Sequence, residues 1–191
     1  MSVNKNHPTE VIKFCPRCGS HSFEIVTERS FLCGDCGFNL YVNSAAAVAC
    51  LIFNAGGELL LTRRAIEPHK GTLDLPGGFV DPGERAEDAV RRELKEELGL
   101  EVLRMSYLDS RPNEYTFGGI TVFTTDLAFM IEPESLQNIA AADDISSFIW
   151  MRPNDVKDTD IPAGSIRYFV KNLAAHILAH ERDKESDFRP V

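Results

Sequence analysis

The chain has 191 residues, of which 43% are hydrophobic and 26% charged, and its formal net charge is −9. This length is enough for one sizeable hydrophobic core and a small additional module. The acidic balance argues against binding of nucleic-acid phosphates by general electrostatic attraction. A polyphosphate ligand would therefore have to bring cations with it.

No apolar stretch approaches the roughly 18 residues that a membrane-spanning helix needs, and the first ten residues contain no apolar core of a signal peptide. The sequence therefore predicts neither a membrane partner nor export. We expect a cytoplasmic protein.

Two C-x-x-C pairs, separated by 14 residues, lie near the N-terminus: Cys15 with Cys18, and Cys33 with Cys36. This spacing is typical of a four-cysteine zinc site. Disulfides are the competing interpretation, but a chain without an export signal is expected in a reducing compartment, where cysteine thiols stay reduced. Four thiolates complete the tetrahedron of Zn²⁺ and leave no place for water, so the predicted role is structural. Cys50, inside an apolar run, is expected to be a core residue.

Between the two cysteine pairs, the runs SFEIV and FL flank the residues ERS, which predicts a hairpin. We therefore predict three parts: a zinc ribbon over residues 10–42, the main domain over 43–182 and a polar C-terminal tail over 183–191. In the main domain, Ser165 is expected to cap the last helix. The predicted strands are Ala45–Phe53, Leu59–Arg64, Glu101–Ser110, Gly119–Ile131 and Ser147–Met151, and the last helix is Ile166–Ala179.

Three carboxylates, Glu93, Glu96 and Glu97, fall on successive turns of one predicted helix. At about 100° per residue they share roughly one face, and apolar residues such as Val90 and Leu94 fall on the same side. Carboxylates spaced in this way repel one another, and burial raises that cost. A counter-charge is therefore needed.

A divalent cation supplies that counter-charge. A ligand set made only of oxygen atoms suits Mg²⁺ or Mn²⁺, which take their remaining ligands from water and substrate phosphates. Gly77 and Gly78, before the helix, allow the backbone to approach a metal or a phosphate closely. Pro82 and Gly83 indicate a tight turn.

The segment from Gly78 to Leu100 resembles the Nudix signature, G-x5-E-x7-R-E-U-x-E-E-x-G-U, where U is aliphatic. It matches at every specified position: Gly78, Glu84, Arg92, Glu93, Leu94, Glu96, Glu97, Gly99 and Leu100. The resemblance implies the Nudix α/β/α sandwich with a mixed sheet, preceded here by the zinc ribbon. A motif of this kind is a hypothesis that its structural context must support.

The resemblance also implies roles. Glu93 and Glu97 are expected to bind the catalytic metal directly, Glu96 directly or through water, and the Gly77 carbonyl as a further ligand. Glu84 and Arg92 are expected to orient these glutamates. Related enzymes take a general base from a later loop, where Asp143 and Asp144 lie; alignment through Trp150 favours Asp144, although a turn or cap is the simpler interpretation of this pair.

A zinc ribbon followed by this domain resembles the NADH pyrophosphatase branch of the superfamily, which cleaves dinucleotides such as NAD(H) into mononucleotides. That branch carries S-Q-P-W-P-F-P after the Nudix signature, which is called the Nudix box below. Here the stretch is Ser110 to Thr116, in which only Ser110 and Pro112 match and Tyr115 stands for the phenylalanine. The altered stretch favours, as an alternative, cleavage of ADP-ribose or nucleotide sugars.

Substrate contacts are expected from Arg111, to phosphate or ribose, and from Tyr115 and Phe117, by stacking on a base. Core packing is an equally good interpretation of the two aromatic residues. A different class of function is a non-catalytic sensor or nucleic-acid-binding regulator, but the box keeps all its glutamates and the ribbon has no basic surface. The expected partner is a small nucleotide diphosphate. Dimerisation is common among relatives, so a homodimer is compatible with the resemblance.

Overall fold

The computed structural model describes residues 4–174 and residue 177. These residues form two compact units. The first contains residues 4–45 together with Glu114–Thr124, and the second contains Ala46–Asn113 and the described residues from Thr125 onward. The predicted C-terminal tail, residues 183–191, and residues 175–176 and 178–179 of the last predicted helix lie outside the described residues.

The first unit is built on a three-stranded antiparallel ribbon with strand order β1–β2–β3. Phe23 pairs with Cys33 and Phe31 with Leu40, so the register places aromatic residues and cysteines on one face. The small core of Cys15, Phe23, Phe31 and Cys33 forms on that face. The hairpin predicted between the cysteine pairs is therefore present. The elements are α1 (Pro8–Val11), β1 (Phe23–Thr27), β2 (Ser30–Cys33) and β3 (Asn39–Tyr41).

The ribbon unit also includes the tip of a hairpin from the middle of the chain. The Thr121 N–H donates to the Asn6 carbonyl over 2.7 Å, and the Asn4 amide donates to the Thr121 hydroxyl over 3.0 Å. The rings of His7 and Phe123 meet edge to face with their centroids 5.7 Å apart. The hairpin tip, Glu114–Thr124, lies outside the range 10–42 that was predicted for the zinc ribbon.

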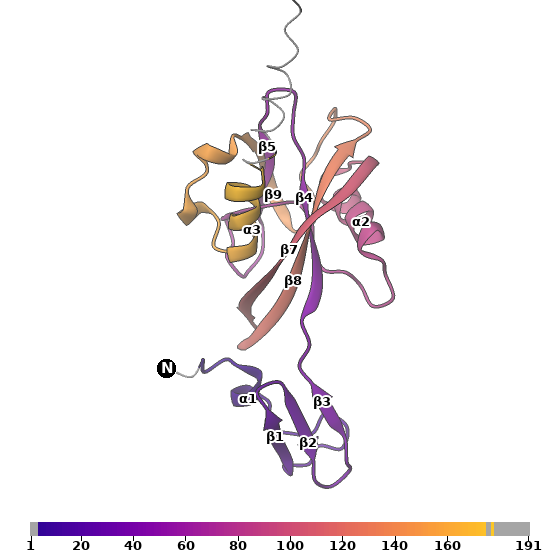
Figure 1. Ribbon diagram of the computed structural model, residues 1–191, viewed down its shortest axis with the longest axis vertical. Coiled ribbons are helices and arrows are strands. Elements are labelled where there is room, and N and C mark those ends of the chain that lie inside the picture. The colour runs from indigo at the N-terminus through magenta and orange to yellow at the C-terminus, as the bar shows by residue number, and fades with distance from the viewer. Residues whose placement is uncertain (1–3, 175–176, 178–191) are drawn as a thin grey trace, which may run out of the picture. The chain divides into compact units, whose positions relative to one another are not determined.

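The second unit contains most of two three-stranded sheets, with orders β4–β8–β7 and β6–β5–β9. In the second sheet β5 pairs antiparallel with both neighbours, as Thr62 does with Asp74 and Phe148. Both sheets are drawn in Figure 1. Their strands are β4 (Ala45–Leu51), β5 (Leu59–Arg64), β6 (Leu73–Asp74), β7 (Val102–Phe117), β8 (Ile120–Pro133) and β9 (Ile145–Met151).

Helices α2 (Ala86–Leu98) and α3 (Gly164–Tyr168) lie on opposite sides of the β4–β8–β7 sheet (Figure 1). The two sides carry separate hydrophobic cores. Val90 and Leu94 of α2 pack in one with Val48 and Phe129. On the other side, the core of α3 and its continuation includes Ala49, Leu61, Ala128, Ile166, Phe169 and Val170. The mixed sheet between helices confirms the predicted α/β/α sandwich.

Two predicted elements differ in extent. The strand predicted to end at Ser110 continues to Phe117, because Gly118 and Gly119, with φ of 58° and 82°, close a two-residue hairpin turn to β8. The last helix begins at Gly164 and continues as the π-helical turn η3 (Phe169–Ala174). Two short 3-10 helices, η1 (Pro153–Asp155) and η2 (Asp158–Asp160), precede it.

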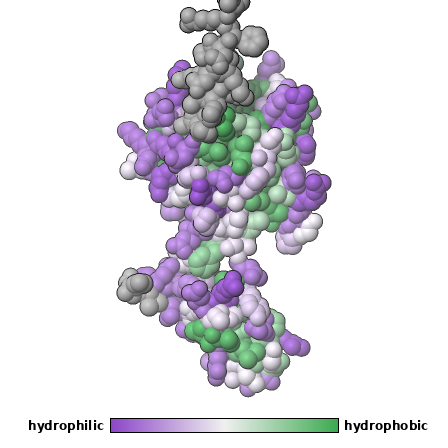
Figure 2. Space-filling model, in the orientation of Figure 1, coloured by the Kyte–Doolittle hydropathy of each residue, from purple (hydrophilic) through white to green (hydrophobic). Residues whose placement is uncertain are grey.

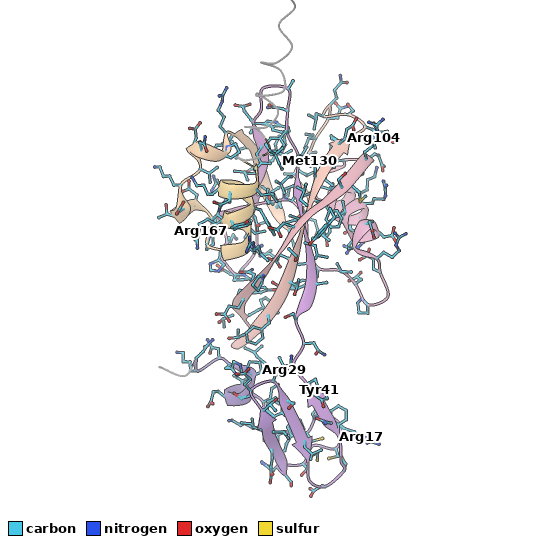
Figure 3. The ribbon with its side chains drawn as sticks, in the orientation of Figure 1. Arg17, Arg29, Tyr41, Arg104, Met130 and Arg167 are labelled. Carbon is cyan, nitrogen blue, oxygen red and sulfur yellow. The ribbon has the colours of Figure 1, made fainter. Side chains whose placement is uncertain are left out.

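Apolar side chains also reach the surface. On the ribbon, Ile25, Val26 and Tyr41 are each more than half exposed, and Figure 2 shows hydrophobic surface over this part of the chain. Arg17 and Arg29 of the ribbon, labelled in Figure 3 with Tyr41, are both exposed. None of the helices in the described part of the chain is long and apolar enough to span a bilayer.

Candidate active site

Helix α2 carries the three predicted carboxylates. Its buried residues are Ala89, Val90, Leu94 and Leu98, and Glu97 is buried with them, with 5% of its surface exposed. Because these positions recur at helical spacing, one face of α2 contacts the core and Glu97 lies on that face. The structure therefore places Glu97 on the apolar side of the helix. The Glu96 side chain, by contrast, is 48% exposed.

Glu97 is held by the glycine-rich loop. The backbone N–H of Gly77 donates to Glu97 Oε2 over 2.9 Å. Burial raises the pKa of Glu97 to about 8; the Gly77 hydrogen bond opposes this rise, whereas the charges of Glu93, Asp74 and Asp144 add to it. With this pKa the Glu97 carboxyl is mostly protonated at neutral pH, and a bound cation would favour its ionised form.

Arg92 binds the other two box carboxylates. Its Nη1 donates to Glu93 Oε1 over 2.8 Å and to Glu96 Oε2 over 3.2 Å. Burial raises the pKa of Glu93 even so, with Arg92 opposing and the charges of Glu96 and Asp143 adding to the rise. The repulsion expected between neighbouring glutamates is thus partly balanced by this guanidinium.

The same guanidinium is fixed from its other side by Glu84. Arg92 Nε and Nη2 donate to the two oxygens of Glu84 over 3.0 and 2.9 Å, and Nη2 also donates to the Phe79 carbonyl over 2.9 Å. Hydrogen bonds from Arg92 and from the Asp81 backbone N–H lower the pKa of Glu84. Such a two-pronged contact sets the orientation of Arg92, and through it that of Glu93.

The loop before α2 runs alongside β4. The Val48 N–H donates to the Gly78 carbonyl over 2.8 Å, and the Val80 N–H to the Ala46 carbonyl over 3.0 Å. A Cβ atom on Gly77, where φ is 136°, would lie 2.2 Å from the Val48 carbonyl oxygen, and one on Gly78 would lie 2.4 Å from Glu93 Oε1. Position 77 therefore requires glycine, whereas a side chain at Gly78 would displace the end of the Glu93 side chain. The Gly77 carbonyl as a metal ligand stays a prediction.

The loop before β9 contacts the end of α2. The Ala142 N–H donates to the Glu97 carbonyl over 2.9 Å, and the Asp144 carbonyl accepts from the Ala65 N–H over 2.8 Å. Asp143 adopts a φ of 51° at the turn between them. The two aspartates thus follow a segment hydrogen-bonded to α2, close enough for their charges to act on Glu93 and Glu97.

The three predicted substrate contacts are divided between the two units. Arg111 belongs to the unit that contains the box, whereas Tyr115 and Phe117 belong to the ribbon unit. The Arg111 guanidinium lies over the Tyr168 ring, with Cζ 3.6 Å from its centroid. Phe117 is 57% exposed, so the core-packing alternative does not hold for it.

Sequence reasoning missed several polar residues of the second unit. Arg64 Nη1 lies 2.9 Å from Asp74 Oδ2. Ser165, predicted to cap the last helix, instead donates its hydroxyl hydrogen to the Asp126 carboxylate, and the helix has no side-chain cap. One signal for the contact with Asp126 was present in the sequence: Asp126 falls within a predicted buried strand, and a buried carboxylate needs a polar partner.

The donor set at the box fits a divalent cation. It consists of carboxylate oxygens, of which one pair is bridged by a guanidinium and one carboxyl is buried with a raised pKa. These oxygens are not tightly gathered. Within the described ranges, the four cysteines are the one group of three or more such residues whose ligand atoms all lie within 4.8 Å of one another.

The four cysteine sulfurs fit zinc. The Sγ atoms of Cys15 and Cys36 are 3.7 Å apart, as are those of Cys18 and Cys33. Tetrahedral ligands at the usual Zn–S length of roughly 2.3 Å stand about 3.8 Å apart. A disulfide needs about 2.05 Å, so this geometry disfavours the competing interpretation. Cys50 is fully buried in the α2 core, as predicted.

A mixed sheet between two helices, with a glycine-rich loop leading into a helix lined with carboxylates, defines a Nudix-type α/β protein. The NUDIX domain family profile matches residues 43–173, more than half of the chain. The chain therefore belongs to the NUDIX family.

Two bacterial proteins are similar to this chain over much of its length. A protein of Pseudomonas fluorescens named NAD-capped RNA hydrolase NudC is 27% identical over 170 residues, which cover 88% of this chain and 58% of that protein. One of the same name from Haemophilus influenzae is 30% identical over 126 residues, which cover 65% of this chain and 47% of that protein. The chain thus spans about half the length of the curated relatives it matches.

Solved structures share the fold. A NUDIX hydrolase from Nitrosomonas europaea superposes with a TM-score of 0.62 at 22% identity, covering 86% of this chain and 92% of that one. The NUDIX domain of NrtR from Shewanella oneidensis superposes with a TM-score of 0.56 at 21% identity, covering 71% and 89%. These likenesses concern the fold.

Proposed function

We propose that this chain is a metal-dependent pyrophosphohydrolase that cleaves the diphosphate of a dinucleotide such as NAD(H) into two mononucleotides. The observation that carries the proposal is the buried Glu97, held by Gly77 and placed beside Glu93 within a complete Nudix box. The four-cysteine ribbon and the relatives named NAD-capped RNA hydrolase support the choice of dinucleotide.

Glu93, Glu96 and Glu97, with the Gly77 carbonyl, would hold Mg²⁺ or Mn²⁺. When bound, such an ion neutralises diphosphate charge and acidifies a water molecule. The Gly77 N–H fixes Glu97 Oε2, and Glu84 positions Arg92 against Glu93. These contacts orient the carboxylates before substrate arrives, which is how fixed groups around a metal site support its function.

Asp144 is proposed as the general base. It would take a proton from the attacking water, whose oxygen forms a bond to one phosphorus while the bond from that phosphorus to the bridging oxygen breaks. The other mononucleotide leaves with that oxygen. The hydrogen bond between Ala142 and Glu97 ties the Asp144 loop to α2, which supports this assignment.

A second candidate is hydrolysis of ADP-ribose or a nucleotide sugar. The observation in its favour is the stretch from Ser110 to Thr116, which lacks the tryptophan of the dinucleotide-cleaving branch and lies within β7. A regulator without catalytic activity is disfavoured because the three box glutamates are all present. The Sγ spacing of 3.7 Å, which disfavours disulfides, suits a cytoplasmic location, and a homodimer is compatible with this family.

A substrate panel tests the proposal. Purified protein with Mg²⁺ or Mn²⁺ is incubated with NAD⁺, NADH, ADP-ribose, a nucleotide sugar and an NAD-capped RNA, and products are separated by chromatography. We expect AMP with nicotinamide mononucleotide from NAD(H), and ¹⁸O from labelled water in the mononucleotide whose phosphorus is attacked. Intact NAD(H) beside rapid cleavage of ADP-ribose would establish the second candidate instead.

A further inference from the structure

The side of the β4–β8–β7 sheet that faces α3 holds a polar cluster that takes no part in the proposed bond cleavage. Asp126 of β8 is 5% exposed and Ser165 of α3 is 2% exposed, and the Ser165 hydroxyl donates to Asp126 Oδ2. Beside them, Tyr168 of α3 stacks under the Arg111 guanidinium. Arg167 of the same helix and Met130 of β8 are labelled in Figure 3 and locate this side of the sheet.

Asp126 has fewer partners than a buried carboxylate needs. An ionised carboxylate has about four acceptor sites, yet within the described residues Ser165 is its one hydrogen-bond donor and no cationic side chain lies within 4.0 Å. Burial of a charge without full hydrogen bonding is costly. The remaining acceptor sites are therefore suited to a donor on a ligand.

Arg111, on the neighbouring strand β7, offers a flat surface on the side of the sheet that faces α3. Its Nε atom is buried and has no hydrogen-bond partner within the described residues; the nearest acidic oxygen, Asp109 Oδ2, is 3.5 Å away. The side chain as a whole is 41% exposed. One face of the guanidinium lies on Tyr168, and a planar cation of this kind stacks readily on aromatic rings.

The cluster lies within reach of the box. The loop that holds Glu97 pairs with β4, as Val48 does with Gly78, and β4 lies beside β8. Two strand spacings of about 4.8 Å separate that loop from β8 by roughly 10 Å. Ala49 of β4, whose side chain is small, packs on the α3 side in between. Asp74 is near enough to both sites for their charges to interact, because the charge of Asp126 adds to the burial that raises the pKa of Asp74, and the charge of Asp74 adds to the rise at Glu97.

We propose that Asp126 accepts a hydrogen bond from the exocyclic NH₂ group of a heteroaromatic ring that stacks beside Arg111 and Tyr168. This inference rests on the proposed function and assigns one end of the substrate. Two rings of NAD carry such a group: adenine, as its 6-amino group, and nicotinamide, as its carboxamide. A ring with an oxygen in place of the amine would bring a lone pair against the carboxylate and bind less well.

Binding of mononucleotide pairs tests the proposal without turnover. The full chain is titrated calorimetrically with AMP and IMP, and with nicotinamide mononucleotide and its nicotinic acid counterpart. We expect the wild type to prefer the NH₂ member of one pair by about tenfold, as for a hydrogen bond to a charged group. The pair that is discriminated identifies the source, adenine or nicotinamide.

Asp126→Asn should bring that preference close to one, because the asparagine amide both donates and accepts. Asp155→Asn, an exposed change in η1, is the matched control and should keep the wild-type ratio. A preference that survives Asp126→Asn, or a wild type that binds both members of each pair equally, overturns the proposal. If Asp126→Asn does not fold, the wild-type affinity ratios within the two mononucleotide pairs decide whether the proposal holds. Discrimination by a protein that leaves NAD(H) intact would refute the proposed reaction but retain this subsite.

Discussion

The backbone N–H of Gly77 donates to the side chain of Glu97, 20 residues later, over 2.9 Å. This bond fastens the glycine-rich loop to the buried face of α2. Because the same loop pairs with β4, the position of the Glu97 carboxylate is set by the sheet as well as by its own helix.

Replacement of Glu97 by glutamine should abolish turnover and leave the fold intact. The amide keeps the shape of the side chain but loses the charge that a cation needs, and we expect a loss of more than about 100-fold in kcat/KM, since even groups that only support metal ligands contribute 10- to 100-fold. Glu101→Gln, an exposed change just beyond α2, is the control. Activity equal to wild type with an unchanged thermal midpoint would exclude Glu97 from the metal site.

Metal affinity should increase with pH. Burial raises the pKa of Glu97 from 4.5 to about 8, so the proton competes with the metal at neutral pH and is released on binding. We expect apparent Mg²⁺ affinity to rise about tenfold per unit between about pH 6 and 8, then to level off. Calorimetry in buffers of different ionisation enthalpy would count the released proton. In Glu97→Gln the proton release should disappear.

The same shift affects stability without metal. Between 4.5 and about 8 the folded state binds more protons at Glu97 than the unfolded chain does, so this group makes the free energy of unfolding fall as pH rises through that window. Denaturant titrations of metal-free protein across the window check the sign. Added Mg²⁺ should oppose the decline, because a ligand that binds only the folded state stabilises it.

Alanine at Gly77 and at Gly78 should cause different defects. At Gly77 the new Cβ would meet the Val48 backbone and require a φ of 136°, so we expect a loss of about 2 kcal/mol or more in the free energy of unfolding. At Gly78 it would meet the end of the Glu93 side chain, which can move. We therefore expect a near-normal free energy of unfolding but a loss of about 100-fold in kcat, as for misplacement of a reacting group by 1 Å. Equal thermal midpoints for the two variants would contradict this difference.

Arg92→Lys should reduce kcat by about 10- to 100-fold with little change in KM. Lysine keeps the charge but cannot make the two-pronged contact with Glu84 while also reaching Glu93. Arg85→Lys, exposed at the start of α2, is the control. Steady-state kinetics at saturating metal separate the two parameters, and a rise in KM alone would point to a substrate contact rather than a positioning role.

The ribbon should hold about one zinc ion per chain. Cys18→Ser removes one thiolate and should lower the zinc content and the thermal midpoint, whereas Cys50→Ala, outside the cluster, should retain the metal. Metal analysis after exhaustive dialysis gives the stoichiometry. A zinc content unaffected by Cys18→Ser would exclude the four-thiolate site.

The sequence was most informative where the pattern is local. The cysteine pairs and the burial of Glu97 follow from spacings of a few residues, and the structure brings these groups together as expected. The extent of β7 could not be predicted, because it depends on pairing with β8 through the Gly118–Gly119 turn. The contact between Ser165 and Asp126 joins residues 39 apart, and no local pattern reveals such a partner.

The arm formed by Asn4, Asn6 and His7 gives the ribbon an unusual order of assembly. Its partners Thr116, Thr121 and Phe123 are made more than 100 residues later, and the Asn4–Thr121 contact spans 117 positions. Contacts of such long range require the closure of a long loop, which slows folding. During synthesis this arm is made before its partners, and its contacts can form only after more than 100 further residues have been added.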